Sequence, residues 1–364
     1  MRAEMPGPRL SRCHYAGPGR RRSRARPAPG CRHPLPAVVC ARVLLRREGG
    51  DVSDTQVTTS VIIPCHDVGR TLGLQLEALW RQQDAEPFEV VVVDNGSTDD
   101  TVAVARSWAD RLDLRVVDAA DRPGAAYARN RGVALCWGAK LLFCDGDDLV
   151  APHFVAHGQR ALEEVPVYVT AFIGVEEKVF RQGYDAVTDQ LEEHDYCSPQ
   201  EERQDQDWPV LPGGCFGIRR DLFLKVGGFD PSAEPGAEDN DLGIRCTDAG
   251  HLPPVLPSTM LAYRIQPAGD RSYALFRRRA RSTALLLTRS GRWGRASIVQ
   301  GPPVLVLLKT CLAVVRPLAR RDRLAWREWR MRLARDAGLA DGYLRYQVLH
   351  RTPRRRTGEG LSEE

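Results

Sequence analysis

Residues 88–94 read FEVVVVD and are followed at 95–101 by NGSTDDT. Four consecutive valines favour a strand that is buried on both faces, as strands of parallel sheets are. The turn residues after Asp94 predict the start of a helix, with Ser97 or Thr98 as its cap. This stretch therefore predicts a strand–helix unit with an acidic residue at the carboxyl end of the strand.

The same kind of unit recurs on both sides of this stretch. We expect further strands at 58–64, 114–118 and 140–145, and helices at 71–83, 97–109 and 125–137. Strand–helix–strand repeats form right-handed crossovers and a parallel, doubly wound sheet. Ligands of such sheets bind at the carboxyl ends of the strands. Acidic and turn residues gather at that edge, in Cys65-His66-Asp67, Asp94-Asn95-Gly96-Ser97 and Asp145-Gly146-Asp147-Asp148.

Length, composition and charge bound the class of protein. The chain has 364 residues, of which 43% are hydrophobic, so it can form one large domain or two ordinary ones. It contains no uninterrupted apolar stretch of about 20 residues, which excludes a polytopic membrane protein. The formal net charge of +5 conceals a strong asymmetry, because an acidic body at 51–270 lies between basic segments at 1–50 and 271–356.

The first fifty residues and the cysteines give two further expectations. Residues 1–50 are rich in Arg, Pro and Gly and show no sustained period, so we expect them to be disordered. An over-extended translation start, or an arm attracted to nucleic acid or membrane, are the alternatives for this segment. The ten cysteines include no C-x-x-C pair and no zinc-like cluster, which fits a reduced, cytoplasmic protein.

The D-G-D-D run at 145–148 is the strongest chemical signal in the body. Three carboxylates in four residues repel one another unless a cation lies among them, and such hard oxygen ligands suit Mg²⁺ or Mn²⁺. The alternative is a solvated turn that caps the next helix. Neither G-x-G-x-x-G nor G-x-x-x-x-G-K-[ST] is present, so a dinucleotide dehydrogenase and a P-loop NTPase lose their main support.

Five motifs in order resemble those of the family 2 glycosyltransferases, which have the GT-A fold. They are SVIIPCHD (60–67), VVVDNGSTDDT (91–101), PGAAYARNRGV (123–133), LLFCDGDD (141–148) and GGCFGIRRDLFLKVGGFDP (213–231), and EDNDLGIR follows at 238–245. The match covers roughly residues 58–265. It implies a Rossmann-like mixed α/β sheet flanked by helices, here with a basic α-helical extension at the C-terminal side.

The resemblance implies a site for a nucleotide-diphosphate sugar. Pro64, His66 and Asp67 would flank the base, and Asp94 would accept a hydrogen bond from its ring N–H. Ser97 and Asp99 would order the loop, while Arg129 and Asn130 would lie beside the nucleotide. Asp145 would contact the ribose and share with Asp147 the binding of Mn²⁺ or Mg²⁺. The sequence offers no His after the last strand of the sheet, so the third metal ligand stays unassigned.

The resemblance also implies an acceptor side. The catalytic residues would be Glu238 and Asp239, with Asp239 as the general base that activates an acceptor hydroxyl. Gly213 and Gly214 would allow the backbone to approach the donor sugar closely. The expected reaction is a single in-line displacement with inversion, and the acceptor would be a glycan, a lipid-linked or a small molecule. For Asp241 we favour a helical ion pair with Arg245.

The expected organisation has four segments. They are a disordered tail at 1–54, a catalytic domain at 55–268 (nucleotide-binding half 55–150, acceptor-side half 151–268), a basic helical region at 269–350 and a disordered tail at 351–364. Residues 271–350 have two interpretations: a surface that docks on anionic membrane at the inner face of the plasma membrane, or helices whose Arg faces pair with the acidic body. We expect no nucleic-acid partner.

Two other functions stay open at this point. A nucleotidyltransferase that makes nucleotide-sugars would use a similar sheet, although it needs a Gly/Arg/Lys-rich loop that P-C-H-D-V-G-R-T does not provide. A non-catalytic nucleotide-sugar-binding protein would keep the fold without turnover. The polar segment 176–210 is expected to form an insert over the acceptor side, in which Tyr184, Tyr196 and Trp208 either stack on sugar or anchor the loop.

Overall fold

The computed structural model describes residues 57–191, 195–200, 204–233, 236–265, 272–320 and 323–362. The expected tail at 1–54 lies outside these residues. The strands are β1 (Thr59–Cys65), β2 (Phe88–Asp94), β3 (Leu114–Asp118), β4 (Lys140–Cys144), β5 (Leu149–Val150), β6 (Val167–Glu176), β7 (Cys215–Arg219) and β8 (Val255–Ile265). The helices among residues 57–265 are α1 (Gly69–Trp80), α2 (Thr101–Arg106), α3 (Ala125–Leu135), α4 (Phe154–Glu164), α5 (Glu177–Phe180), α6 (Tyr184–Thr188), α7 (Arg220–Lys225), η2 (Pro231–Ala233) and α8 (Glu238–Asp248).

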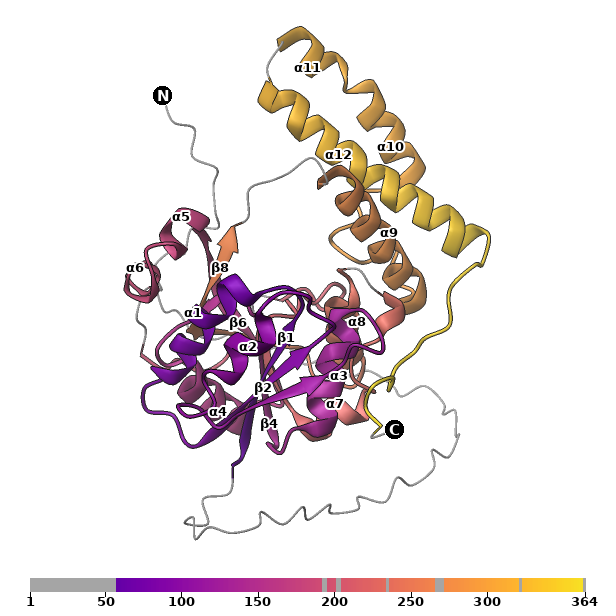
Figure 1. Ribbon diagram of the computed structural model, residues 1–364. Coiled ribbons are helices and arrows are strands. Elements are labelled where there is room, and N and C mark those ends of the chain that lie inside the picture. The colour runs from indigo at the N-terminus through magenta and orange to yellow at the C-terminus, as the bar shows by residue number, and fades with distance from the viewer. Residues whose placement is uncertain are drawn as a thin grey trace, which may run out of the picture. The chain divides into compact units, whose positions relative to one another are not determined.

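One mixed sheet lies at the centre of the α/β region formed by residues 57–265 (Figure 1). Its strand order is β3-β2-β1-β4-β7-β6-β8-β5. The strands β3, β2, β1 and β4 are mutually parallel, as the repeated strand–helix units predict. Beyond β4 the direction changes, because β7 pairs antiparallel with β4 and β6 pairs antiparallel with β7. The expected mixed α/β sheet flanked by helices is confirmed.

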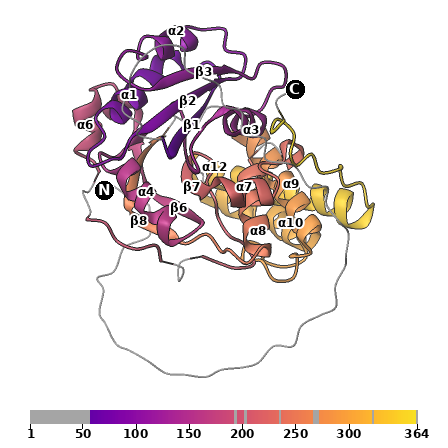
Figure 2. The same cartoon turned by 90° about the horizontal axis from the view of Figure 1, so that it is seen from below.

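Two hydrophobic cores lie on opposite faces of the sheet, because successive residues of a strand point to opposite sides. Val61 and Ile63 of β1 pack with α1, α2 and α4, whereas Ile62 packs with α3, α7 and α8. The helices are accordingly divided between the two faces (Figure 2). The valines of β2 are fully buried on both faces, as their continuous run predicts.

The second helix begins later and ends earlier than expected, since α2 spans Thr101–Arg106 rather than 97–109. Side-chain hydrogen bonds hold the preceding loop outside the helix. The Asp67 carboxylate accepts from the backbone N–H of Thr98 at 2.7 Å, and Ser97 Oγ accepts from Asp67 N at 3.1 Å. The Asp99 carboxylate accepts from Gly69 N at 2.9 Å, so this loop is tied to the start of α1.

A helical extension follows β8, as expected. It comprises α9 (Ser272–Ser290), α10 (Pro303–Leu312), α11 (Val315–Arg320), α12 (Arg323–Gly342) and the π-helical turn η3 (Tyr343–Val348). Arg289 of α9 forms an ion pair with Asp230 at 3.0 Å, and Arg292, in the turn after α9, forms one with Asp248 at 2.8 Å. The end of α9 and the turn after it are therefore paired with the acidic body.

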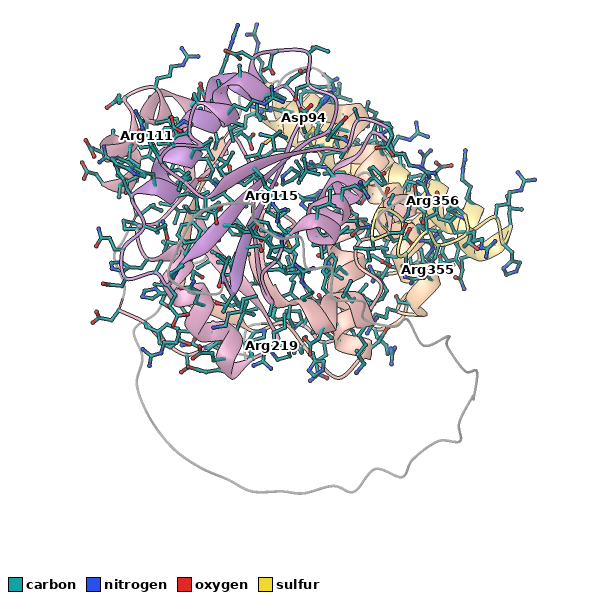
Figure 3. The ribbon with its side chains drawn as sticks, turned by 60° about the horizontal axis from the view of Figure 1, so that its bottom comes forward. Asp94, Arg111, Arg115, Arg219, Arg355 and Arg356 are labelled. Atoms are coloured by element: carbon teal, nitrogen blue, oxygen red, sulfur yellow. The ribbon has the colours of Figure 1, made fainter. Side chains whose placement is uncertain are left out.

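Residues 351–362, which we name the C-terminal strap, pack against the α/β region instead of forming the expected disordered tail. Arg355 pairs with Asp241 of α8 at 3.0 Å, and the backbone N–H of Arg356 donates to Asp230 at 3.0 Å. Figure 3 labels both arginines on this segment. Leu361 packs on the core formed with α3, α7 and α8. The strap is ordered by carboxylates of the acidic body, such as Asp230 and Asp241. These lie far from the strap in the sequence, so the residues of the strap alone did not predict its structure.

No helix within the described ranges is long and apolar enough to cross a membrane.

The buried pair of Asp230 and Arg289 yields a stability prediction. Asp230 is fully buried and Arg289 nearly so. We expect Asp230→Ala to lower the free energy of unfolding by about 3–5 kcal/mol, because it leaves a buried guanidinium without its carboxylate. Denaturant unfolding would measure this loss. Glu163→Ala, which removes a largely exposed partner of Lys140, is the matched control and should cost about 1 kcal/mol or less. Equal losses for the two variants would contradict the prediction.

Candidate active site

The centre of the site lies where β4 ends and β7 begins. The two strands pair antiparallel with Cys144 opposite Cys215, so Asp145 and Gly214 face each other just beyond the sheet. A Cβ atom at Gly214 would lie 2.2 Å from Asp145 Oδ2, which no real contact allows. The glycine is therefore needed for the close approach of the Asp145 carboxylate. The resemblance implied that the backbone at Gly214 approaches the donor sugar closely. In the structure, the group that Gly214 approaches closely is the Asp145 carboxylate.

Arg129 connects this centre to helix α3. Its guanidinium is nearly buried and donates from Nη2 to Asp145 Oδ1 at 2.8 Å. A Cβ atom at Gly213 would lie 3.0 Å from Arg129 Nη1, so this glycine also makes room for a charged side chain. Arg129 places a positive charge beside the acids of the site, and its partner there is Asp145.

Asp239 reaches the same centre from the first turn of α8. Its Oδ2 accepts from Gly213 N at 3.2 Å and its Oδ1 accepts from Asn240 N at 2.7 Å. Burial and the neighbouring Glu238 carboxylate raise the pKa of Asp239 to about 6, against these hydrogen bonds and the charge of Arg129. Glu238 itself accepts from Ala237 N at 2.9 Å, which makes it part of the helix start. Asp239 is thus a carboxyl group whose pKa lies above the usual range of aspartate.

A pocket opens between the strand ends on the nucleotide side. It is lined by Pro64, Cys65, His66, Val68, Asn95, Ala125, Ala128, Arg129, Asp145, Gly146 and Asp147. Four residues that the resemblance assigns to the donor site line this pocket, namely Pro64, His66, Arg129 and Asp145. The expected metal ligand Asp147 lines it as well. Asp67 follows β1, and its backbone N–H donates to Ser97 Oγ in the loop after β2. In that loop Asp94 Oδ1 accepts from Ser97 N at 3.2 Å.

The residues beside Asp145 fit a divalent cation only in part. Asp147 lines the pocket and offers a hard oxygen ligand together with Asp145. Asp148 is buried and accepts from Arg264 N at 2.9 Å, and burial with the nearby Asp145 raises its pKa to about 8. Within the described ranges, no three His, Cys, Asp or Glu side chains converge as a ligand set. Two carboxylates fit a metal whose other ligands are water and phosphate oxygens.

Sequence reasoning missed Arg264 on β8. Its buried guanidinium donates to the backbone oxygen of Asp147 at 2.6 Å and pairs with Glu177 at 2.8 Å. It therefore fixes the D-G-D-D turn from β8, which pairs with the strand β5 that follows this turn. The available signal was an arginine within a largely apolar strand, because a buried arginine requires acidic partners.

Other polar residues near the centre have structural roles. Asn130 is fully buried; its Oδ1 accepts from Phe229 N at 2.9 Å, and its Nδ2 donates to Glu359 O in the C-terminal strap at 2.7 Å. Both polar atoms of the Asn130 side chain are therefore hydrogen-bonded within the protein. Asp241 pairs with Arg245 at 2.7 Å, as favoured from the sequence, and with Arg355 as well.

The three aromatic residues of segment 176–210 anchor loops. Tyr184 lies under the guanidinium of Arg81, 4.4 Å from its carbon to the ring centre, and Tyr196 lies under Arg160 at 4.0 Å. Trp208 is buried in a third hydrophobic cluster, which joins α8 to α9. Of the two interpretations of these side chains, the anchoring role is the one that the contacts support.

This sheet, with its acid-lined edge and helices on both faces, defines an α/β domain of the GT-A glycosyltransferase type. Residues 60–227 match the family model described as Glycosyl transferase family 2. The fold is similar to that of the mannosyltransferase PcManGT from Pyrobaculum calidifontis, solved with GDP-Man and Mn²⁺. The TM-score is 0.55 and the identity 22%, over 79% of this chain and 86% of that chain.

Curated relatives match the chain over shorter segments. A PGL/p-HBAD biosynthesis glycosyltransferase of Mycobacterium bovis (strain BCG / Pasteur 1173P2) is 41% identical over 90 residues, which are 24% of this chain and 35% of that protein. Validoxylamine A glucosyltransferase of Streptomyces hygroscopicus subsp. jinggangensis is 43% identical over 98 residues, which are 26% of this chain and 23% of that protein. The matched segments thus span only a quarter to a third of these relatives.

Proposed function

We propose that this protein is an inverting glycosyltransferase that moves a sugar from a nucleotide-diphosphate sugar to a hydroxyl group of an acceptor. The observation that carries the proposal is the convergence of Asp145, Arg129 and Asp239 around the Gly213–Gly214 turn. This turn joins the donor pocket to the start of α8, so one centre combines acids for donor binding with a candidate base.

The donor nucleotide would bind in the pocket at the ends of β1, β2 and β4. Pro64 and His66 line its wall and would contact the base, with Asp67 and Ser97 ordering the adjoining loop. Asp94 would accept from the ring N–H, and Asp145 would accept from the ribose hydroxyls. Arg129 holds Asp145 in place and would oppose the negative charge of the diphosphate.

Asp147 and Asp145 are the residues that would hold Mn²⁺ or Mg²⁺. Such an ion, when bound, supplies positive charge that stabilises the departing diphosphate. Arg264 acts on this site indirectly, because it fixes the backbone of Asp147. The Pyrobaculum mannosyltransferase has Mn²⁺ and GDP-Man in its structure, which supports the chemistry but leaves the donor of this chain to experiment.

Asp239 would act as the general base. Its carboxylate takes the proton of the acceptor hydroxyl while the hydroxyl oxygen forms a bond to the anomeric carbon. The bond from that carbon to the diphosphate oxygen breaks, and the nucleoside diphosphate leaves with the electron pair. Gly213 N and Asn240 N fix the orientation of the carboxylate. Attack opposite the leaving group inverts the anomeric configuration. The acceptor must carry a hydroxyl group, and a glycan, a lipid-linked molecule or a small molecule can provide one.

Calorimetry on the full chain tests the donor site. We expect one of UDP, GDP and dTDP to bind in a Mn²⁺-dependent manner, and Asp147→Ala to weaken that binding by about tenfold or more, since Asp147 would hold the ion that offsets the charge of the diphosphate. Asp118→Ala is the matched control, because Asp118 is exposed at the same sheet edge. Failure of every nucleotide to bind with any metal, or unchanged binding by Asp147→Ala, would contradict the proposal.

Turnover separates the remaining alternatives. With a sugar donor and an acceptor, the proposed enzyme releases free nucleoside diphosphate. A nucleotidyltransferase would release pyrophosphate, and a binding protein would release neither.

A further inference from the structure

A pocket that we name the cationic pocket lies between α9 and the segment where α12 passes into η3. Its volume is about 360 Å³. Its lining includes four arginines, one acid and one tyrosine, namely Arg277, Arg278, Arg281, Arg345, Asp341 and Tyr273. One carboxylate can offset one guanidinium charge, so the described lining of the pocket has an excess of positive charge.

Two glycines of α12 bring this helix directly onto α9, and Figure 1 shows the two helices side by side. A Cβ atom at Gly338 would lie 2.2 Å from the backbone oxygen of Arg277. A Cβ atom at Gly342 would lie 2.4 Å from Ala284 Cβ and 3.1 Å from the backbone oxygen of Arg281. The backbones therefore touch at two of the arginines, so packed helices hold the walls of the cationic pocket.

The acid of the cationic pocket is shared between two of its arginines. Asp341 Oδ2 lies 3.7 Å from Arg281 Nη1, and Asp341 Oδ1 accepts from Arg345 Nε at 3.4 Å. Arg277 and Arg278 form no ion pair with an acid in the described part of the chain. Arg277 and Arg281 stand four residues apart on α9, a spacing at which like charges repel. An anion with two or more charges would offset this repulsion.

We propose that the cationic pocket binds a phosphate group with two or more negative charges, as in a phosphate monoester or a diphosphate. A guanidinium presents its N–H donors in a planar fork that matches the oxygens of a phosphate. Arginines from both helices surround the group, and Asp341 orients Arg281 and Arg345. The proposal goes beyond the sugar transfer and does not depend on it, because this pocket shares no lining residue with the donor pocket.

A second cavity, of about 740 Å³, adjoins the cationic pocket. Asp341 and Arg345 line both cavities. Leu344, Leu349 and Pro353 are among the other residues that line the second one. There is therefore room beside the phosphate for the organic part of a phosphate ester. Such an ester has two sources, a lipid headgroup or a soluble phosphorylated compound.

Calorimetry with pyrophosphate tests the cationic pocket on the full chain, in buffer with EDTA so that no divalent metal is present. We expect wild type to bind pyrophosphate, and Arg277→Gln combined with Arg281→Gln to weaken this binding by about tenfold or more, because two charge-assisted contacts are lost. Arg106→Gln combined with Arg111→Gln is the matched control. It removes the same charge from two exposed arginines elsewhere and should bind within about twofold of wild type.

Thermal unfolding checks that the pocket variant is folded. Without ligand it should be at least as stable as wild type, because two arginines that repel each other are removed. Pyrophosphate should raise the unfolding temperature of wild type more than that of the pocket variant. Absence of wild-type binding, or equal losses for the pocket and control variants, would overturn the proposal. Binding of nucleotide with Mn²⁺, measured on the same samples, distinguishes a failure here from a failure of the donor site.

Vesicle flotation identifies the source of the phosphate. Phosphatidic acid presents a phosphate monoester, whereas phosphatidylglycerol presents a diester with a single charge. Binding to vesicles that contain phosphatidic acid, displaced by pyrophosphate and lost in the pocket variant, would identify a lipid headgroup. Binding of pyrophosphate without binding to either kind of vesicle would identify a soluble phosphorylated compound.

Discussion

Asp239→Asn should lower the rate of sugar transfer by about 10²–10⁴-fold, the range expected when a general base is removed. The amide keeps the size of the side chain but cannot take the proton of the acceptor hydroxyl. The fold should persist, because burial and Glu238 already disfavour the ionised carboxyl at this position. Donor nucleotide affinity, measured by calorimetry, should stay within about threefold of wild type, since the proposed role of Asp239 is to act on the acceptor.

The pH dependence of the wild-type rate checks the same assignment. The pKa of Asp239 is raised to about 6, so the proton-free base is present above that pH and is lost as pH falls through it. The rate should therefore decrease on the acid side of about pH 6. Glu238→Gln removes the neighbouring negative charge and should move this acid limb to lower pH. Full activity of Asp239→Asn, together with an inactive Glu238→Gln, would instead make Glu238 the base.

Gly214→Ala should weaken donor binding and transfer by about 10- to 100-fold, because displacement of a catalytic-site group by about 1 Å costs this much. The added Cβ would lie 2.2 Å from Asp145 Oδ2 and 2.4 Å from its carboxyl carbon. The carboxylate must therefore rotate away, which breaks its bond to Arg129 and moves it out of the donor pocket. Initial rates over a range of donor concentrations, with calorimetry of the nucleotide, measure the effect.

Two other glycines serve as controls for Gly214. At Gly294 an added Cβ meets nothing within 4 Å, so Gly294→Ala should behave as wild type. At Gly213 it would meet the end of the Arg129 side chain at 3.0 Å, and we expect a smaller loss than at Gly214 because that end can shift. Equal activity of the Gly214 and Gly294 variants would show that the position of Asp145 does not limit donor binding.

The strands of the parallel half could be predicted to within a residue or two. Their cores are continuous runs such as Val90–Val93, whose burial needs no knowledge of distant segments. The start of α2 could not be predicted in this way. The backbone N–H groups of Thr98 and Asp99, in the loop before α2, donate to the Asp67 carboxylate, which is more than thirty residues away in the sequence. The same limit applies to the C-terminal strap, whose composition suggests disorder until the acids of α8 and its neighbours are brought beside it.

The sequence by itself determined the family resemblance, the α/β class and the acidic character of the strand ends, because these follow from local runs of residues and their order along the chain. Only the tertiary structure decided which acids meet. Arg129 pairs with Asp145, Gly213 binds Asp239, and Arg264 fixes Asp147 across 117 residues. Such contacts depend on strand order and register, which set distances between side chains that no local pattern encodes.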